Sequence, residues 1–138
     1  MSDFRGARGS NTGDDFHELW ATRHAIRLLL NEDGFEALAV EGLAANDERR
    51  AADETWDGVD CTLYFGGSDA AHATEVVLEQ LKYSAAAPTT PWTVARLVGG
   101  DRREKSVIAR LAKAWKGLAD LRPGSSAPGA KLVSNQPI

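Results

Sequence analysis

The sequence has little of what builds a secreted, zinc-binding or membrane-spanning protein. Its single cysteine, Cys61, cannot form an internal disulfide, and no paired Cys and His spacing suggests a zinc site. Residues 1–13 are polar and glycine-rich, without the apolar core of a signal peptide. The apolar run at residues 25–30 is short and is interrupted by Arg27. We therefore expect a cytoplasmic protein that does not enter the membrane.

An overall excess of basic residues is also missing, because the net charge is −4. The charge is unevenly distributed along the chain. Residues 1–89 hold 7 Lys and Arg and 17 Asp and Glu, a net charge of −10, whereas residues 90–138 hold 9 and 3, a net charge of +6. An acidic part beside a basic part suits a metal-dependent phosphodiesterase, which needs carboxylates for the metal and cations for the phosphates. Two solvated faces joined by ion pairs show the same signature, so charge alone leaves both interpretations open.

Hydrophobic periodicity predicts a helix, three strands, a second helix and a last strand. The expected elements are a helix at residues 14–31, strands at 35–43, 59–65 and 75–83, a helix at 104–121 and a strand at 131–134. In the first helix the residues that recur near helical spacing are Phe16, Leu19, Trp20, Ile26 and Leu30. The polar stretch at residues 44–55 is either a loop or a short solvated helix.

These elements predict an α/β fold with a mixed sheet of at least four strands and helices on both of its sides. The strand at residues 75–83 is apolar on both faces, which is typical of a central strand. The length of 138 residues suits one domain with one core. We expect residues 1–13 to be a flexible lead and residues 14–138 to be the folded domain.

The predicted central strand also carries the best candidates for chemistry. Gln80 and Lys82 share one of its faces, because alternate residues of a strand point the same way. Lys82 is the only Lys or Arg between residues 51 and 95, and Asp60 at the start of the preceding strand can meet it across the sheet. A carboxylate and an amide oxygen can hold Mg²⁺, and a nearby lysine can orient water and neutralise charge. The alternative is that Lys82 extends into solvent at a strand end and Gln80 is an exposed polar residue.

Asp60 followed by Gln80-x-Lys82 on the next strand, within this order of elements, resembles the PD-(D/E)xK nuclease superfamily. The similar groups are the Mrr-like restriction nucleases and the double-strand DNA nuclease domains of bacterial anti-phage proteins, among them CD-NTase-associated endonucleases and domains fused to STAND ATPases. The segments that carry the resemblance are residues 8–16, 40–42, 57–60, 80–84 and 94–97. The element order covers nearly the whole chain, and the resemblance implies a restriction-endonuclease-like core.

The resemblance assigns roles residue by residue. Asp60 matches the metal-binding carboxylate, Gln80 takes the position usually held by Asp or Glu, and Lys82 matches the catalytic lysine. Glu41 matches an acid that many relatives place on the first strand. Two features depart from the pattern: Gln80 brings no charge to the metal, and three residues compete as the helix-one acid. The competing helix-one acids are Glu18, Asp14 and Asp15, and Asp57 is a less favoured rival to Asp60.

The activity that the resemblance implies is metal-assisted hydrolysis of DNA phosphodiester bonds by a Mg²⁺-dependent endodeoxyribonuclease, with Mn²⁺ as the other candidate ion. The expected substrate is double-stranded DNA, and the expected role is bacterial anti-phage defence. Arg102, Arg103 and Lys105 are the candidates to hold its backbone, without reading base sequence. Further expectations are that the chain is the N-terminal effector part of a longer protein with a C-terminal STAND ATPase or sensor part, and that it forms a homo-oligomer.

Two other classes of function stay open at this point. In the first, the fold is the same but the site is inactive, because Gln80 is a weak ligand, and the domain only binds DNA or a partner protein. In the second, the chain is an interaction domain of a larger protein, and its task is assembly.

Overall fold

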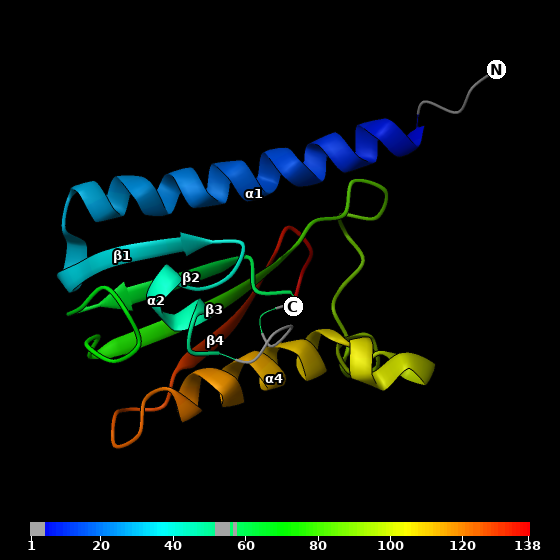
Figure 1. The fold of residues 1–138 in the computed structure, drawn as a ribbon. Helices are drawn as coiled ribbons and strands as arrows, with labels where there is room; N and C mark the ends of the chain where they lie inside the picture. The colour runs from blue at the N-terminus through cyan, green and yellow to red at the C-terminus, as the bar shows by residue number, and fades with distance from the viewer. Residues whose placement is uncertain (1–4, 52–55, 57) are drawn as a thin grey trace.

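In the described part of the chain, four strands form one mixed sheet with a long helix on each face (Figure 1). The structure is a computed structural model that describes residues 5–51, 56 and 58–138. The strands are β1 (Phe35–Val40), β2 (Cys61–Phe65), β3 (Glu75–Lys82) and β4 (Gly129–Ser134). The helices are α1 (Arg5–Leu29), α2 (Ala45–Glu48), α3 (Val94–Val98) and α4 (Val107–Asp120), with 3₁₀ turns η1 (Glu32–Gly34) and η2 (Gly100–Lys105). The predicted α/β class, with a mixed sheet flanked by helices, is confirmed.

The strands lie in the order β1-β2-β3-β4, which places β3 between two neighbours as its apolar sequence predicts. β1, β2 and β3 pair antiparallel, and β4 pairs parallel to β3. A parallel pair needs a crossover connection, and the segment containing α3, η2 and α4 provides it. The turn between β2 and β3 depends on Gly67, because a Cβ there would lie 2.5 Å from the backbone carbonyl carbon of His72.

One face of the sheet is covered by α1, through residues spaced four apart along the helix. Phe16, Trp20 and Leu28 pack against a buried cluster of the sheet, and His24 on the same line is only 3% exposed. The Nε1–H of Trp20 donates to Oε2 of Glu79 over 2.7 Å, and Nε2 of His24 lies 2.8 Å from the same oxygen. Hydrogen bonds to one buried carboxylate therefore dock α1 on β3, together with apolar packing.

The buried face of α1 differs from the predicted one. Leu19, Ile26 and Leu30, which periodicity placed on the buried stripe, are more than half exposed. The polar His24 lies in the interior instead, because the Glu79 carboxylate of β3 requires a hydrogen-bonding partner there. Hydrophobicity alone therefore selected the wrong face for part of this helix.

The start of α1 also differs from the predicted boundary. The helix begins at Arg5, so residues 5–13, expected to be a flexible lead, are helical. Glycines in this segment lower its helix propensity, but a helix that is already nucleated extends by one hydrogen bond per added residue. Residues 1–4 lie outside the described part of the chain. No described helix is both long and apolar enough to cross a membrane.

The other face of the sheet is covered by α4, which begins at a capped N-terminus. The Ser106 hydroxyl accepts a hydrogen bond from the N–H of Ala109 over 3.1 Å. Ala114 and Leu118 are fully buried and join a cluster with β2 and β3 residues. Ile108 on the same helix is 47% exposed.

The long connection between β1 and β2 is anchored by Asp47 in α2. Its buried carboxylate accepts hydrogen bonds from the Tyr64 hydroxyl over 2.8 Å and from the N–H of Ala70. The Tyr64 oxygen in turn accepts from the N–H of Ala44. Burial raises the pKa of Asp47, although these hydrogen bonds oppose the rise. The connection is thus tied to β2, and this arrangement helps to place its two ends, Glu41 and Asp60.

Substitution of Leu118 by Ala tests the packing of α4 on the sheet. Leu118 has no exposed surface, so Leu118→Ala should lower the free energy of unfolding by about 2–5 kcal/mol, from lost burial and the cavity left behind. Ile108→Ala on the same helix is the control and should cost less than about 1 kcal/mol. Urea unfolding measures both, and equal losses would show that α4 does not pack as described.

Candidate functional site

Asp60 lies just before β2 and is held by neighbours on both sides. Its backbone N–H donates to the carbonyl oxygen of Glu79 over 2.9 Å, and its own carbonyl oxygen accepts from the N–H of Glu41 over 2.8 Å. Its side-chain Oδ2 accepts a hydrogen bond from the N–H of Leu81 over 2.6 Å. Because it binds the residues on either side of Gln80, Asp60 lies opposite Gln80 in the sheet. The sequence predicted that Asp60 meets Lys82 across the sheet, whereas the residue opposite Asp60 is Gln80.

The environment of Asp60 opposes its ionisation. Burial raises the pKa of Asp60, and the hydrogen bond from Leu81 and the positive charges of His17 and Lys82 oppose that rise. The Glu41 carboxylate adds repulsion that raises the pKa further. A cation placed beside this carboxylate would relieve the cost of its charge.

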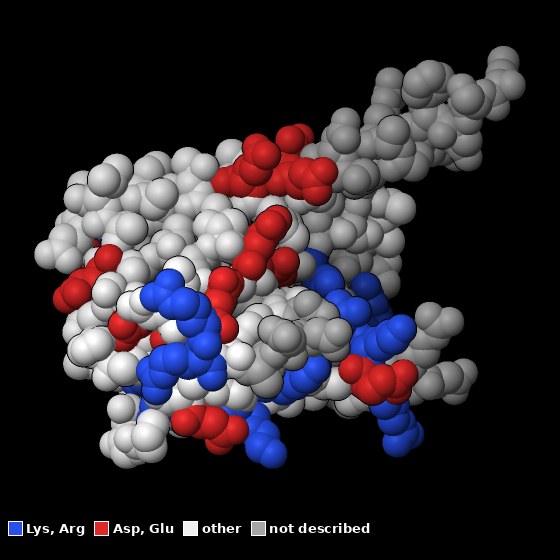
Figure 2. Space-filling view, in the orientation of Figure 1, with Lys and Arg blue, Asp and Glu red and all other residues white. Residues whose placement is uncertain are grey.

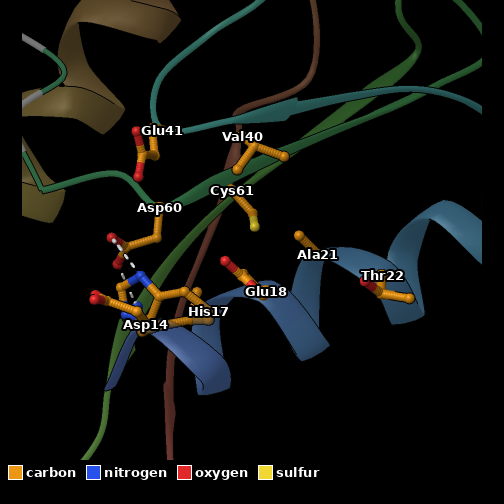
Figure 3. A pocket seen from close by; sticks show the side chains of 10 residues that line it. Asp14, His17, Glu18, Ala21, Thr22, Val40, Glu41, Asp60 and Cys61 are labelled. Atoms are coloured by element: carbon orange, nitrogen blue, oxygen red, sulfur yellow. Dashed lines mark hydrogen bonds and ion pairs between the residues drawn. The ribbon is translucent and has the colours of Figure 1, made fainter. Parts of the chain in front are cut away.

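Asp60 opens onto a cleft of about 580 Å³ between α1 and the ends of β1 and β2. Figure 3 shows His17 and Glu18 from α1 facing the same space as Glu41 and Asp60. Nδ1 of His17 lies 3.7 Å from Oδ1 of Asp60. Carboxylates and one imidazole therefore line one cleft at the end of the sheet.

The three candidate helix-one acids differ in their position relative to the cleft. Glu18 and Asp14 both line the cleft, and Asp15 does not. Asp57, the rival to Asp60, lies outside the described residues. Glu18, the preferred helix-one candidate, thus shares the cleft with Asp60, and Asp14 remains its competitor.

Gln80 is oriented differently from Asp60. Its side chain is 1% exposed, and among the described residues neither its amide nitrogen nor its amide oxygen has a hydrogen-bond partner. It lies beside Gly58, where a Cβ would come within 3.0 Å of both the Gln80 amide nitrogen and Cδ of Arg110. Gly58 also has a φ of +88°, so glycine is required there by conformation and by space. Gln80 therefore faces α4 and does not line the cleft with Asp60.

Lys82 is half-buried at the end of β3. It shares the Gln80 face by alternation and is close enough to lower the pKa of Asp60. Like Gln80, it is absent from the lining of the cleft. The structure thus brings Glu41 and Asp60 together in one cleft. The charge of Lys82 acts on Asp60 from outside the cleft lining, and Gln80 faces α4.

Few side chains around Asp60 are placed to hold a metal ion. Within residues 5–51, 56 and 58–138, no three His, Cys, Asp or Glu side chains are close enough together to bind an ion. Asp60 and Glu41 therefore offer two carboxylates in the cleft, with the imidazole of His17 nearby. The amide oxygen of Gln80 is also a ligand type that a hard cation accepts, but this side chain faces α4.

The candidate DNA-binding residues lie in η2, which precedes α4. Arg103 and Lys105 are exposed, and the side chain of Arg102 lies outside the described part of the structure. On the face shown in Figure 2, acidic side chains gather over α1, and basic side chains lie both over α2 and around α4, with acidic side chains among them.

Two features of this region escaped sequence reasoning. The first is that His17 lies beside Asp60, and the second is that Glu79 is buried with Trp20 and His24. The spacing of the histidines along the sequence indicated neither contact. The sequence did contain a signal for the burial of Glu79, because a carboxylate within an apolar strand needs an interior partner.

Comparisons of the chain with protein-family models, with curated proteins and with solved structures give no match.

The buried Asp60 is expected to cost folding stability. Its raised pKa means that its contribution is most favourable below the ordinary value of 3.8 and is lost as the pH rises through the folded-state pKa. Asp60→Asn should therefore raise the Tm near neutral pH, and this gain should vanish well below pH 3.8. Thermal unfolding across that pH range measures the effect.

The matched control is Asp15→Asn, which removes one negative charge from an exposed position on α1. An equal, pH-dependent gain in Tm in both variants would attribute the effect to net charge and would contradict the role of burial at Asp60.

Proposed function

We propose that this chain is a restriction-endonuclease-like domain that hydrolyses DNA phosphodiester bonds with a bound divalent metal. One observation carries the proposal: Oδ2 of Asp60 accepts the N–H of Leu81, the residue between Gln80 and Lys82. An aspartate at the start of one strand is thereby held against a Gln-x-Lys sequence on the next. The order of helix, three strands, helix and strand supports the same assignment.

The metal is proposed to be Mg²⁺ or Mn²⁺, both of which bind carboxylate and amide oxygens. Asp60 and Glu41 would supply the carboxylates. Gln80 would supply its amide oxygen by turning from α4 toward Asp60, since this oxygen has no hydrogen-bond partner among the described residues. A bound ion would stabilise charge on the phosphate and make water a better nucleophile. Because Gln80 is uncharged, the negative charge at this site rests on Asp60 and Glu41.

Lys82 is proposed to orient the attacking water and to balance the charge that develops on the phosphate. Its positive charge already acts on Asp60, so it lies close enough to act on a group bound there. Arg103 and Lys105 would hold the DNA backbone, with Arg102 beside them in η2. Phosphate contacts of this kind carry no base sequence information. The resemblance to anti-phage nuclease domains extends the proposal to a defence effector.

A second candidate function is an inactive nuclease-like module that binds DNA or a protein partner. The position of Gln80 favours it, because this side chain is 1% exposed and does not line the cleft that holds Asp60. DNA binding without metal-dependent cutting would select this alternative.

Substitution of Lys82 by Ala tests the proposed chemistry directly. Loss of a preorganised cation that stabilises the transition state should lower the cutting rate by about 10²- to 10³-fold while the fold stays intact. Plasmid DNA incubated with the protein and Mg²⁺ or Mn²⁺, beside EDTA, provides the assay, and circular dichroism monitors the fold.

Lys116→Ala is the matched control, because Lys116 is an exposed lysine on α4. It should cut at the wild-type rate. Full activity of Lys82→Ala would eliminate the mechanism, and metal-independent cutting would eliminate the proposed cofactor.

The DNA-binding surface is tested by Arg103→Gln and Lys105→Gln. Each variant should weaken DNA binding in EDTA and reduce the slope of log affinity against log salt by about one, because one phosphate contact is lost. Fluorescence anisotropy of a labelled duplex across several salt concentrations gives the slope. Arg50→Gln removes the same charge from an exposed position after α2 and should leave the slope unchanged.

A further inference from the structure

A second cleft, of about 400 Å³, lies between α1 and β4. We refer to it as the α1–β4 cleft. Arg23 and Arg27 from α1 and Lys131 from β4 line it, together with Trp20, His24 and Glu79. The residues of α1 that line it project from one side of the helix, and those that line the Asp60 cleft project from the other side. The two clefts therefore use different side chains.

The Glu79 carboxylate at this cleft already has two protein partners on one of its oxygens. Its Oε2 lies 2.7 Å from Trp20 Nε1 and 2.8 Å from His24 Nε2. Arg27 Nη1 lies 3.3 Å from His24 Nδ1. A guanidinium only donates, so Nδ1 must accept and the imidazole proton lies on Nε2, from which it is donated to Glu79. The buried carboxylate is thus engaged inside the protein, so the cleft is not a cation site.

The cations that line the cleft are only partly neutralised. The Arg27 Nε donates to Oε2 of Glu32 over 3.0 Å, which fixes its guanidinium and balances one charge. Arg23 and Lys131 are exposed, and neither has a carboxylate within ion-pair distance in the described part of the chain. Two uncompensated positive charges therefore flank a concave surface.

The aromatic surface in the cleft is also occupied. The guanidinium of Arg23 lies 5.0 Å from the centroid of the Trp20 ring. The His24 ring meets the same indole in a T-shaped contact at 5.4 Å. A nucleobase stacking on Trp20 would have to displace these partners, whereas an anion would only have to meet the guanidinium. The cleft is therefore built to bind charge and not to stack a base.

We propose that the α1–β4 cleft binds a phosphate group through Arg23, Arg27 and Lys131. A guanidinium presents planar, paired donors that match phosphate oxygens, and an ammonium adds a point charge. The phosphate belongs either to a nucleic-acid backbone or to a free phosphoanion. This site does not depend on Asp60, Gln80 or Lys82, so it can exist whether or not the chain is a nuclease.

Titration with pyrophosphate at constant ionic strength, followed in ¹H–¹⁵N spectra of the full chain, tests the proposal. We expect saturable shifts confined to residues 20–27 and 131–133. Arg23→Gln and Lys131→Gln should each weaken binding by about tenfold, because a charge-assisted hydrogen bond is lost. Both residues are exposed, so their replacement should leave the fold intact, as circular dichroism can verify.

Lys116→Gln is the matched control, since it removes an exposed lysine from α4, on the opposite face of the sheet. It should bind pyrophosphate as the wild type does. Absence of saturable shifts, or equal weakening in Lys116→Gln, would overturn the proposal, because only non-specific charge attraction would remain.

A short single-stranded DNA oligonucleotide identifies the source of the phosphate. Shifts of the same resonances with both probes, reduced by Arg23→Gln, would assign the cleft to a nucleic-acid backbone. Shifts with pyrophosphate alone would assign it to a free phosphoanion. Failure with both probes would reject the site while leaving the cutting assay at Asp60 and Lys82 unaffected.

Discussion

The position of α1 depends on a carboxylate buried in the middle of the sheet. Glu79 is 2% exposed on the central strand, and Trp20 and His24 of α1 are its hydrogen-bonding partners. A buried carboxylate that loses a hydrogen-bond donor is costly to the fold, so this contact strongly restricts where the helix can lie. With α1 docked in this way, His17 and Glu18 face Asp60 on one side, and Arg23 and Arg27 face β4 on the other.

The region around Asp60 and Gln80 contains groups that lower the stability of the fold. Asp60 is held as a half-buried carboxylate with a raised pKa, and Gln80 keeps two buried polar atoms that have no partner in the described part of the chain. Both features are unfavourable in a purely structural role, because buried polar groups are normally hydrogen-bonded. Binding sites commonly retain such unfavourable buried groups, because a ligand supplies the missing interactions. The same atoms that destabilise the fold are those for which we propose a metal.

Prediction from the sequence succeeded where the pattern was local. The apolar residues at 75–83 predicted a central strand, and β3 lies between β2 and β4. It failed where the decisive partner lies far along the chain. His24 occupies the interior in place of Ile26 because of Glu79, which is 55 residues away in sequence. The proximity of His17 to Asp60 has the same origin.

The sequence by itself determined the α/β class, the order of the long elements and the identity of the central strand, because periodicity and apolar content are properties of neighbouring residues. Only the tertiary structure decided which side of α1 is buried, that Gln80 faces α4 away from the Asp60 cleft, and that Arg23 and Lys131 meet across a second cleft. These outcomes depend on how the helices dock on the sheet. Docking is set by contacts between distant residues, which no local pattern encodes.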